Sequence, residues 1–241
     1  RGHTVTVFEK ADRLGGMYGC AAVPPWKGEI SSFIVWQRTQ LEKLGVVVHY
    51  NTELTAEIVA QDKPDTVVIA TGTNPWAPPI PGLEGERVIS AVDLLTGKVN
   101  ADGKIAVIGG GLVGSETANY LATHENQVTI IEMMDEIAKE EPGNMKRFLM
   151  QSFEEHGVKI YTDTKVLEVT EEGIIVAEKN GEKIQAGPFD FIVTAVGMKP
   201  NRELYNQLEE TEFEVVCVGD AGTTKNALEA IEDAYQKALE I

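Results

Sequence analysis

The chain has 241 residues, of which 43% are hydrophobic and 24% charged, as is typical of globular proteins. Its formal net charge of −17 disfavours nucleic acid and anionic membrane surfaces as partners, because both are themselves negatively charged. No apolar run is long enough to cross a bilayer, and the two cysteines form neither a disulfide framework nor a metal-site spacing. We therefore expect a cytoplasmic chain without a metal site.

The first third of the chain alternates β-branched runs with a helical pattern. The run TVTVF and the run TVVIA are typical of buried strands, and Gly45 follows a helical pattern as a C-terminal cap. Four prolines between residues 74 and 85 indicate a crossing between domains. The chain begins with Arg1-Gly2-His3 instead of Met, which favours a fragment or a processed chain. We expect strands over 4–8, 46–50 and 66–70 and a helix over 30–44, with a loop over 14–16.

The remainder continues the alternation, with a hairpin signal at Asn180-Gly181. This pattern predicts an α/β fold of parallel sheets with helices on both faces, and an antiparallel insert after residue 172. TVTVFEK is similar to VTIIEMM, and VVIATG to FIVTAVG, as two related dinucleotide-binding domains would be. We expect helices over 112–124, 144–156 and 226–241 and strands over 104–108, 128–132, 159–161, 166–169, 173–179, 183–186, 189–195 and 213–218.

A glycine-rich turn carries the strongest functional signal. Gly109, Gly111 and Gly114 fit G-x-G-x-x-G directly after an expected strand and before an expected helix, and Glu132 ends the next strand. The glycines permit a tight turn, close approach of a pyrophosphate and close packing of the helix, whose N-terminus attracts the phosphates. Glu132 is expected to accept the ribose hydroxyls, which favours NADH over NADPH. The alternative is a glycine turn that binds no ligand.

Two further stretches resemble parts of a second nucleotide site. Glu9 ends the first expected strand, and Gly15 and Gly16 follow it as a glycine loop. Gly219 and Asp220 follow a buried strand, where ligands bind in open α/β sheets. Alternatively, Glu9 is a solvated carboxylate at the end of a strand and binds no ligand. A G-x-G-x-x-G motif for this second site is expected upstream of the chain's first residue.

Together these motifs resemble the two-dinucleotide-binding-domain flavoproteins. More specifically, the chain resembles the C-terminal part of 2-enoate reductase, 2,4-dienoyl-CoA reductase and trimethylamine dehydrogenase. The similar stretches are FEK-ADRLGGM at 8–17, PP-K-EI at 24–30, KPDTVVIATGTNP at 63–75, IAVIGGGLVGSETANYLA at 105–122 and VCVGDAGTTKNALEAIEDAY at 217–235.

The resemblance implies an NAD-binding domain over 79–201, inserted in an FAD-binding-like domain over 1–78 and 202–241. The latter domain would lack its first strand and glycine loop, so the chain alone is expected to bind FAD weakly or not at all. In such proteins a (β/α)₈ barrel with FMN and an iron–sulfur cluster precedes this part and receives electrons from NADH through FAD. The positions expected to contact FAD are Glu9, Gly15, Gly16, Thr71, Gly72, Gly219 and Asp220. Those expected to contact NADH are Gly109, Gly111, Gly114, Glu116, Glu132 and Gly197, with Glu116 near the nicotinamide.

Two other functions remain open at this point. The chain could be a non-catalytic module that holds ADP, or a thiol-based NADH oxidase or peroxidase that uses Cys20. No acid–base pair is expected to be catalytic, since hydride transfer requires that the two cofactors be positioned and water excluded. The expected partners are the nicotinamide and flavin nucleotides and the barrel. The oligomeric state is open, with a homo-oligomer as one option.

Overall fold

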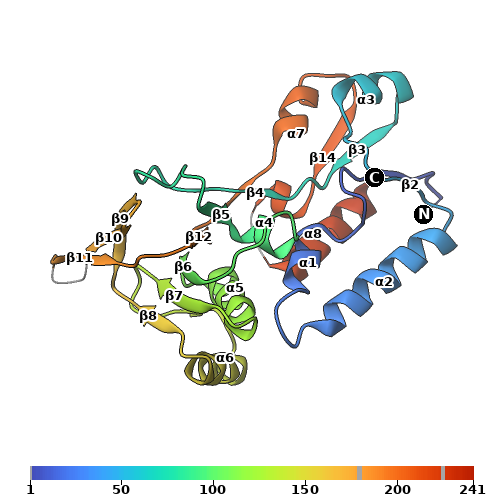
Figure 1. Ribbon diagram of the computed structural model, residues 1–241. Helices are drawn as coiled ribbons and strands as arrows, with labels where there is room; N and C mark the ends of the chain where they lie inside the picture. Colours follow the sequence, from blue (N-terminus) through green and yellow to red (C-terminus); the bar gives the residue numbers. More distant parts are fainter. Residues whose placement is uncertain (1, 178–180, 224–225) are drawn as a thin grey trace. The chain divides into compact units, whose positions relative to one another are not determined.

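The structure is a computed structural model that describes residues 2–177, 181–223 and 226–241 (Figure 1). Its backbone divides into two compact units, which are described separately below. Unit 1 comprises Arg1–Ala22, Glu29–Asn74 and Met198–Ile241, and unit 2 comprises Val23–Gly28 and Pro75–Gly197. The longest uninterrupted segment of unit 2 runs from Pro75 to Gly197, and the short segment Val23–Gly28 also falls in unit 2, unlike the residues that flank it.

Unit 2 is built on a five-stranded sheet in which the strand order is β5-β12-β6-β7-β8 and all neighbouring strands are parallel. The central strands consist largely of Val and Ile, as strands buried on both faces require. The strands are β5 (Val88–Ser90), β6 (Lys104–Ile108), β7 (Gln127–Ile131), β8 (Lys159–Tyr161) and β12 (Phe191–Thr194).

The two faces of this sheet are covered differently. Ile105 and Val107 pack with residues of the helices α4 (Ala91–Leu95), α5 (Leu112–Thr123) and α6 (Gly143–Glu155). Ala106 and Ile108 point the other way and pack with Val166, Ile174 and Val176 of an antiparallel sheet. That sheet has the order β11-β10-β9 and comprises β9 (Lys165–Thr170), β10 (Gly173–Ala177) and β11 (Lys183–Ala186).

The antiparallel sheet is the insert that was expected after residue 172 in place of a crossover helix, and it begins earlier than expected, with β9 at Lys165. In unit 2 the connection after β8 is the three-stranded insert, so strands cover the face that a crossover helix would otherwise cover. The expected pairing on either side of Asn180-Gly181 is present between β10 and β11. Asn180 itself lies outside the described residues.

Unit 1 contains two separate parallel strand pairs. One joins β1 (Thr6–Phe8) to β2 (Val47–His49), and the other joins β3 (Thr66–Ile69) to β14 (Glu214–Cys217). Among the described residues, no strand ladder joins β1 to β3. The helices are α1 (Gly16–Ala21), α2 (Gly28–Lys43), α3 (Ala56–Asp62), α7 (Glu203–Leu208), α8 (Ala227–Glu240) and the short 3₁₀ turn η1 (Gly219–Ala221).

A second core lies in unit 1 around the β3–β14 pair. Val59 of α3, Val67 and Ile69 of β3, and Leu208 of α7 are all almost fully buried there. A further two-stranded sheet pairs β4 (Thr73–Pro75) with β13 (Met198–Pro200), where the chain passes from one unit to the other and back. The segments at the crossings near residues 74 and 198 are therefore paired strands.

The α/β class and the long elements agree with the expectations. The expected strand 104–108 is β6, and the expected helix 112–124 is α5 with one residue fewer. The expectation of a loop over 14–16 was wrong at its end, because Gly16 is the first residue of α1 and Gly15 is its N-terminal cap. No helix within the described ranges has both the length and the apolar character needed to cross a lipid bilayer.

Candidate dinucleotide-binding site

The candidate site lies where the strand order of unit 2 changes direction. From β6 the chain passes through α5 to β7 and on to β8 on one side, whereas β12 pairs with the opposite edge of β6. Ligands of open parallel sheets bind at the carboxyl ends of the strands at such a switch point. The residues 109–114, called the glycine loop below, follow the carboxyl end of β6 and lead into α5.

Gly109 makes the turn out of β6. Its φ is 99°, a conformation that residues with a side chain rarely adopt, and a Cβ atom there would lie 2.6 Å from the carbonyl oxygen of Ala195. Its N–H donates to the carbonyl of Ile131 at the end of β7 (2.9 Å). Gly114 is equally confined, because a Cβ atom would collide with the carbonyl oxygen of Gly109. These two glycines set the shape of the loop and the closeness of α5 to the sheet.

Gly111 differs from both. It is exposed, and no heavy atom lies within 4 Å of the position that a Cβ atom would take. It caps α5, whose first N–H groups have no acceptor within the helix. Ser115 Oγ donates to the carbonyl of Gly110 (2.9 Å) and so holds the loop against the first turn. An open glycine in front of a helix N-terminus fits a pyrophosphate group.

Glu132 follows β7 directly and is 8% exposed. Its Oε2 accepts the N–H of Gly110 (2.5 Å), and its Oε1 accepts the N–H of Met134 (2.7 Å). The motif predicted an acid at this position, but not that its carboxylate joins the glycine loop to the segment after β7. Each carboxylate oxygen has a further lone pair with which it can accept a hydroxyl group.

Glu116 lies in the second turn of α5, where its Oε1 accepts from Lys27 Nζ at 2.5 Å. Lys27 belongs to the similar stretch PP-K-EI, but its contact with Glu116 was not predicted, because spacing offered no signal for a contact between residues 89 positions apart. Gly197 follows β12 with a φ of 151°, and its carbonyl accepts the N–H of Trp76 (3.1 Å). Gly197 therefore lies beyond the carboxyl end of the strand beside β6, as expected for a residue at the switch point.

In unit 1, Glu9 directly follows β1. Its Oε1 accepts the N–H of Ala11 (2.7 Å), which forms a short turn after the strand. Gly15, with a φ of 125°, caps α1 and packs against Ile34 of α2. Gly16 begins α1 with a φ of 47°. The structure thus places the residues 9–16 in one connected turn and helix start.

The other expected residues of unit 1 follow two neighbouring strands. Thr71 and Gly72 come after β3, and Gly219 and Asp220 come after β14, the strand that pairs with β3. Thr71 Oγ1 donates to the carbonyl of Asn201 (2.6 Å), and the carbonyl of Gly72 accepts the N–H of Asn201 (2.9 Å). These four residues therefore lie beyond the carboxyl ends of the parallel strands β3 and β14.

Asp233 of α8 is a further residue that the sequence patterns missed. Its Oδ2 accepts the N–H of Gly219 (2.8 Å), and Lys237 Nζ donates both to Asp233 and to the carbonyl of Cys217 (2.6 Å). The two side chains are spaced i, i+4 and so share one face of α8. Together they fix the turn η1 that carries Asp220.

The two thiols differ in their surroundings. Cys20, in α1, is buried, with 5% of its surface exposed. Burial raises the pKa of the Cys217 thiol, against the opposing effect of Arg202 and Lys237. In the part of the chain that the structure describes, no group of three or more His, Cys, Asp or Glu side chains is arranged to hold a metal ion.

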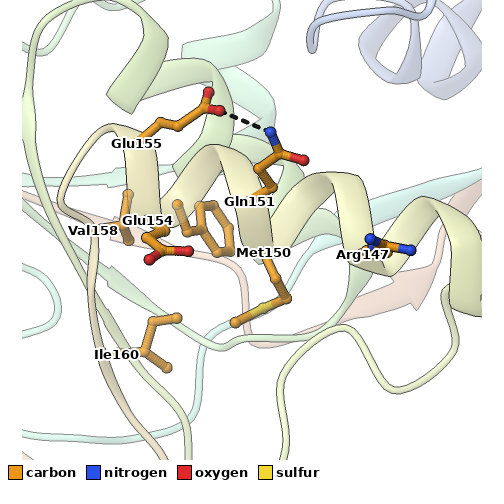
Figure 2. A pocket seen from close by; sticks show the side chains of 8 residues that line it. Arg147, Met150, Gln151, Glu154, Glu155, Val158 and Ile160 are labelled. Carbon is orange, nitrogen blue, oxygen red and sulfur yellow. Dashed lines mark hydrogen bonds between the residues drawn. The ribbon is translucent and has the colours of Figure 1, made fainter.

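A shallow hollow lies elsewhere in unit 2, between α6 and β8 (Figure 2). Figure 2 shows Met150, Val158 and Ile160 around an apolar floor, with Gln151 Nε2 donating to Glu155 Oε1 (2.9 Å) beside it. None of its lining residues belongs to the glycine loop, α5 or β12. It is therefore distinct from the candidate site.

Comparison with known proteins agrees with this geometry. The family described as pyridine nucleotide-disulphide oxidoreductase matches residues 37–225. Among curated proteins, the chain is 36% identical over 239 residues to a bilirubin reductase of Mediterraneibacter gnavus (strain CC55_001C) and 38% identical over 253 residues to an NADH oxidase of Thermoanaerobacter brockii. These alignments cover 99% and 100% of the chain, but only 37% and 38% of the two relatives.

Among solved structures, a 2-naphthoyl-CoA reductase in complex with 2-naphthoyl-CoA superposes with a TM-score of 0.95 at 29% identity. The superposition covers 100% of this chain and 36% of that one. The chain thus spans less than two fifths of the length of these relatives, which are reductases or oxidases by name. Because the family match covers most of the sequence, the chain belongs to the pyridine nucleotide-disulphide oxidoreductase family.

Proposed function

We propose that this chain is the nucleotide-binding part of an NADH-dependent flavin oxidoreductase, and that unit 2 binds the NADH. The observation that carries the proposal is the hydrogen bond from Gly110 N–H to Glu132 Oε2. It joins an open glycine turn, a helix N-terminus and a buried carboxylate at the switch point of a parallel sheet. Dinucleotides are recognised by this combination of groups.

Each group then has a defined task. Gly111 gives the pyrophosphate access to the first N–H groups of α5. Glu132 accepts hydrogen bonds from the hydroxyl groups of the adenosine ribose, using the carboxylate lone pairs that are not engaged by the N–H groups of Gly110 and Met134. A carboxylate in this place repels a 2′-phosphate, and the exposed residues Met133 and Met134 offer no positive charge to offset that repulsion. NADH is therefore preferred to NADPH.

The flavin part of the proposal concerns unit 1. Glu9 after β1, and Thr71, Gly72, Gly219 and Asp220 after β3 and β14, are the residues that would contact FAD together with Gly15 and Gly16. In the described part of the chain, β1 and β3 belong to separate strand pairs. A strand between them would form backbone hydrogen bonds with both, and without it one side of each strand has no hydrogen-bonded partner strand. We propose that FAD binds weakly or not at all to this chain alone.

When bound, NADH supplies a hydride, which passes to the flavin. The chain's own residues hold the nucleotide and take no part as acid or base. The names of the relatives, a bilirubin reductase and an NADH oxidase, support reductive chemistry of this kind. The final acceptor would be chosen by a barrel with FMN and an iron–sulfur cluster, outside the region that this chain covers in its relatives.

One structural observation favours a second function, that of a non-catalytic ADP-binding module. The glycine loop, the N-terminus of α5 and Glu132 all serve the adenosine diphosphate half of a dinucleotide. A thiol-based oxidase receives less support, because Cys20 is buried.

Dye reduction separates these functions. A protein that joins this chain to its barrel is expected to reduce dichlorophenolindophenol with NADH. It should retain that activity when Cys20 is changed to Ser. Binding of NADH without any dye reduction would favour the ADP-binding module, and loss of activity on Cys20→Ser would favour the thiol route.

A further inference from the structure

Gly110, within the glycine loop, has both of its backbone polar groups bonded inside the protein. Its N–H donates to Glu132 Oε2 (2.5 Å). Its carbonyl oxygen accepts two hydrogen bonds, one from Ser115 Oγ (2.9 Å) and one from the N–H of Ala138 (2.7 Å). Ser115 and Ala138 are both 0% exposed, so these two bonds are shielded from water. The orientation of the backbone at Gly110 is therefore fixed from the buried side of the loop.

Ala138 belongs to the connection between β7 and α6 and has an unusual backbone conformation. Its φ is 46°, in the left-handed region that residues with a side chain seldom adopt. Such a conformation persists where the surrounding structure enforces it, and Ala138 and its neighbour Ile137 both belong to the core of unit 2. Ile137 also approaches the loop directly, because its Cγ2 lies 2.5 Å from the place that a Cβ atom on Gly110 would take. The connection therefore packs closely against the buried side of the glycine loop.

The two bonds to the Gly110 carbonyl also determine the direction of the next N–H group. The carbonyl of Gly110 and the N–H of Gly111 belong to one planar trans peptide unit, in which the two groups point in opposite directions. The carbonyl points toward its buried donors, Ser115 and Ala138. The N–H of Gly111 therefore points away from them, and Gly111 is exposed. This arrangement places a backbone donor on the side from which a ligand can approach.

A donor in this position suits the negative charge of a phosphate group. Because the carbonyl of the same peptide unit already accepts two hydrogen bonds, the unit is polarised and its N–H is a stronger donor. Gly111 also caps the N-terminus of α5, where the helix dipole favours an anion. Ser115 and Ala138 can thus influence the binding of an anion without contacting it.

We propose that Ser115 and Ala138 are positioning residues of the dinucleotide site: their hydrogen bonds to the Gly110 carbonyl direct the N–H of Gly111 toward the pyrophosphate. This role rests on the proposed function, which assigns the pyrophosphate to the glycine loop. Both residues lie outside the G-x-G-x-x-G motif, since Ser115 directly follows its last glycine and Ala138 comes after the next strand. They act through the Gly110–Gly111 peptide and contact no reacting atom.

Two matched variants of the whole chain test this role. Ser115→Ala removes one hydrogen bond to the Gly110 carbonyl. Thr117→Val is the control, because Thr117 is also a 0% exposed residue of α5 and its hydroxyl donates to the carbonyl of Val113 (2.7 Å), outside the contacts of Gly110. Far-UV circular dichroism checks that each variant is folded.

Each variant would be titrated with NADH, by calorimetry, and with adenosine, by NMR. Adenosine has the ribose of the dinucleotide but no phosphate, so it does not need the N–H of Gly111. Ser115→Ala is expected to weaken NADH binding by about three- to tenfold and adenosine binding by less than about twofold. Thr117→Val should change neither dissociation constant by more than about twofold.

The NMR signal of the Gly111 amide reports the proposed contact itself. Backbone assignment of the isotope-labelled wild-type chain identifies this signal. NADH should move its proton resonance downfield, as a hydrogen bond to a phosphate does, and should move it less in Ser115→Ala. Ala138→Val places a branched side chain in the left-handed backbone, which disfavours that conformation, so it should also weaken NADH binding more than adenosine binding.

The outcomes separate this role from the proposed function. If Ser115→Ala binds NADH as the wild type does, or loses affinity for NADH and adenosine equally, the positioning role is wrong and the NADH site stands. The role is also wrong if NADH binds the wild type without moving the Gly111 signal, a result that does not depend on the folding of any variant. If the wild type binds no NADH, the proposed function itself fails.

Discussion

Glu132 Oε2 accepts the N–H of Gly110 at 2.5 Å, so the acid after β7 is a structural part of the glycine loop. In the same carboxylate, Oε1 accepts the N–H of Met134. One buried side chain therefore holds two backbone segments that are more than twenty residues apart in sequence. Substitutions at Glu132 should consequently change both nucleotide affinity and stability.

The first prediction concerns Glu132→Ala. It leaves the N–H groups of Gly110 and Met134 without their acceptor, at a cost of about 1–3 kcal/mol for the buried donor of Gly110 and less for the part-buried donor of Met134. We expect the free energy of unfolding of the unit to fall by about 1–3 kcal/mol, measured by urea denaturation. Asp135→Ala, at an exposed neighbouring position, is the control. If the free energy of unfolding falls by less than about 0.5 kcal/mol, the two hydrogen bonds of Glu132 do not stabilise the fold.

The second prediction contrasts two glycines of the loop. Gly114→Ala places a Cβ atom on the carbonyl of Gly109 and should destabilise the fold by about 1–3 kcal/mol. Gly111→Ala meets open space and should cost about 1 kcal/mol or less, yet it blocks the approach of the pyrophosphate. Thermal unfolding and NADH titration would be measured for both variants. Wild-type NADH affinity in Gly111→Ala would contradict the placement of the phosphates.

The third prediction concerns thiol reactivity. Cys20 is buried, and burial raises the pKa of Cys217, so less of that thiol is ionised at neutral pH than in an exposed cysteine. Both should react slowly with dithionitrobenzoate in the native chain and rapidly in urea. Because the pKa of Cys217 is raised, the rate of the Cys217 reaction should still be increasing above pH 9. Fast native labelling of Cys20 would revive the thiol-based alternative.

The fourth prediction concerns the start of α4. Ser90 Oγ accepts the N–H of Asp93 (3.0 Å) and donates to its Oδ2 (2.8 Å). Ser90→Ala should therefore cost about 1 kcal/mol of unfolding free energy. Burial opposes ionisation of Asp93, but the bonds from Ser90 and Lys98 outweigh it and lower the pKa of the carboxyl.

That lowered pKa makes the contribution of Asp93 dependent on pH. The stabilisation is fully present above the ordinary pKa of an unfolded aspartate and is lost as the pH falls through the lower folded value. The difference in stability between the wild type and Asp93→Asn should therefore be larger at pH 7 than in strong acid. An equal difference at both pH values would show that ionised Asp93 is not favoured by folding.

The sequence predicted the elements in which pattern and length agree. The strand 104–108 and the helix that follows it were placed to within a residue, because a glycine turn separates a run of Val and Ile from a good helix former. Shorter helices such as α3 and α7 were not predicted, since six or seven residues carry too little periodicity. Ser90 and Asp93 stand at capping spacing, so α4 had a readable signal that was overlooked.

The candidate site shows the same division. The glycine motif and the acid after the next strand could be placed from sequence, because both belong to one βαβ unit. The pairs Lys27–Glu116 and Gly219–Asp233 could not, because they depend on how distant segments pack. The antiparallel sheet was predicted as an insert, but not the face of the parallel sheet that it covers. The structure shows that this is the face to which Ala106 and Ile108 point.

The central claim is tested most directly by calorimetric titration of this chain with NADH, NADPH and FAD in parallel. We expect NADH to bind well ahead of NADPH, because Glu132 disfavours a 2′-phosphate, and FAD to bind little. Tight FAD binding would contradict the account of unit 1. If none of the three nucleotides binds, the glycine loop is a structural turn between β6 and α5, and the proposed function is wrong.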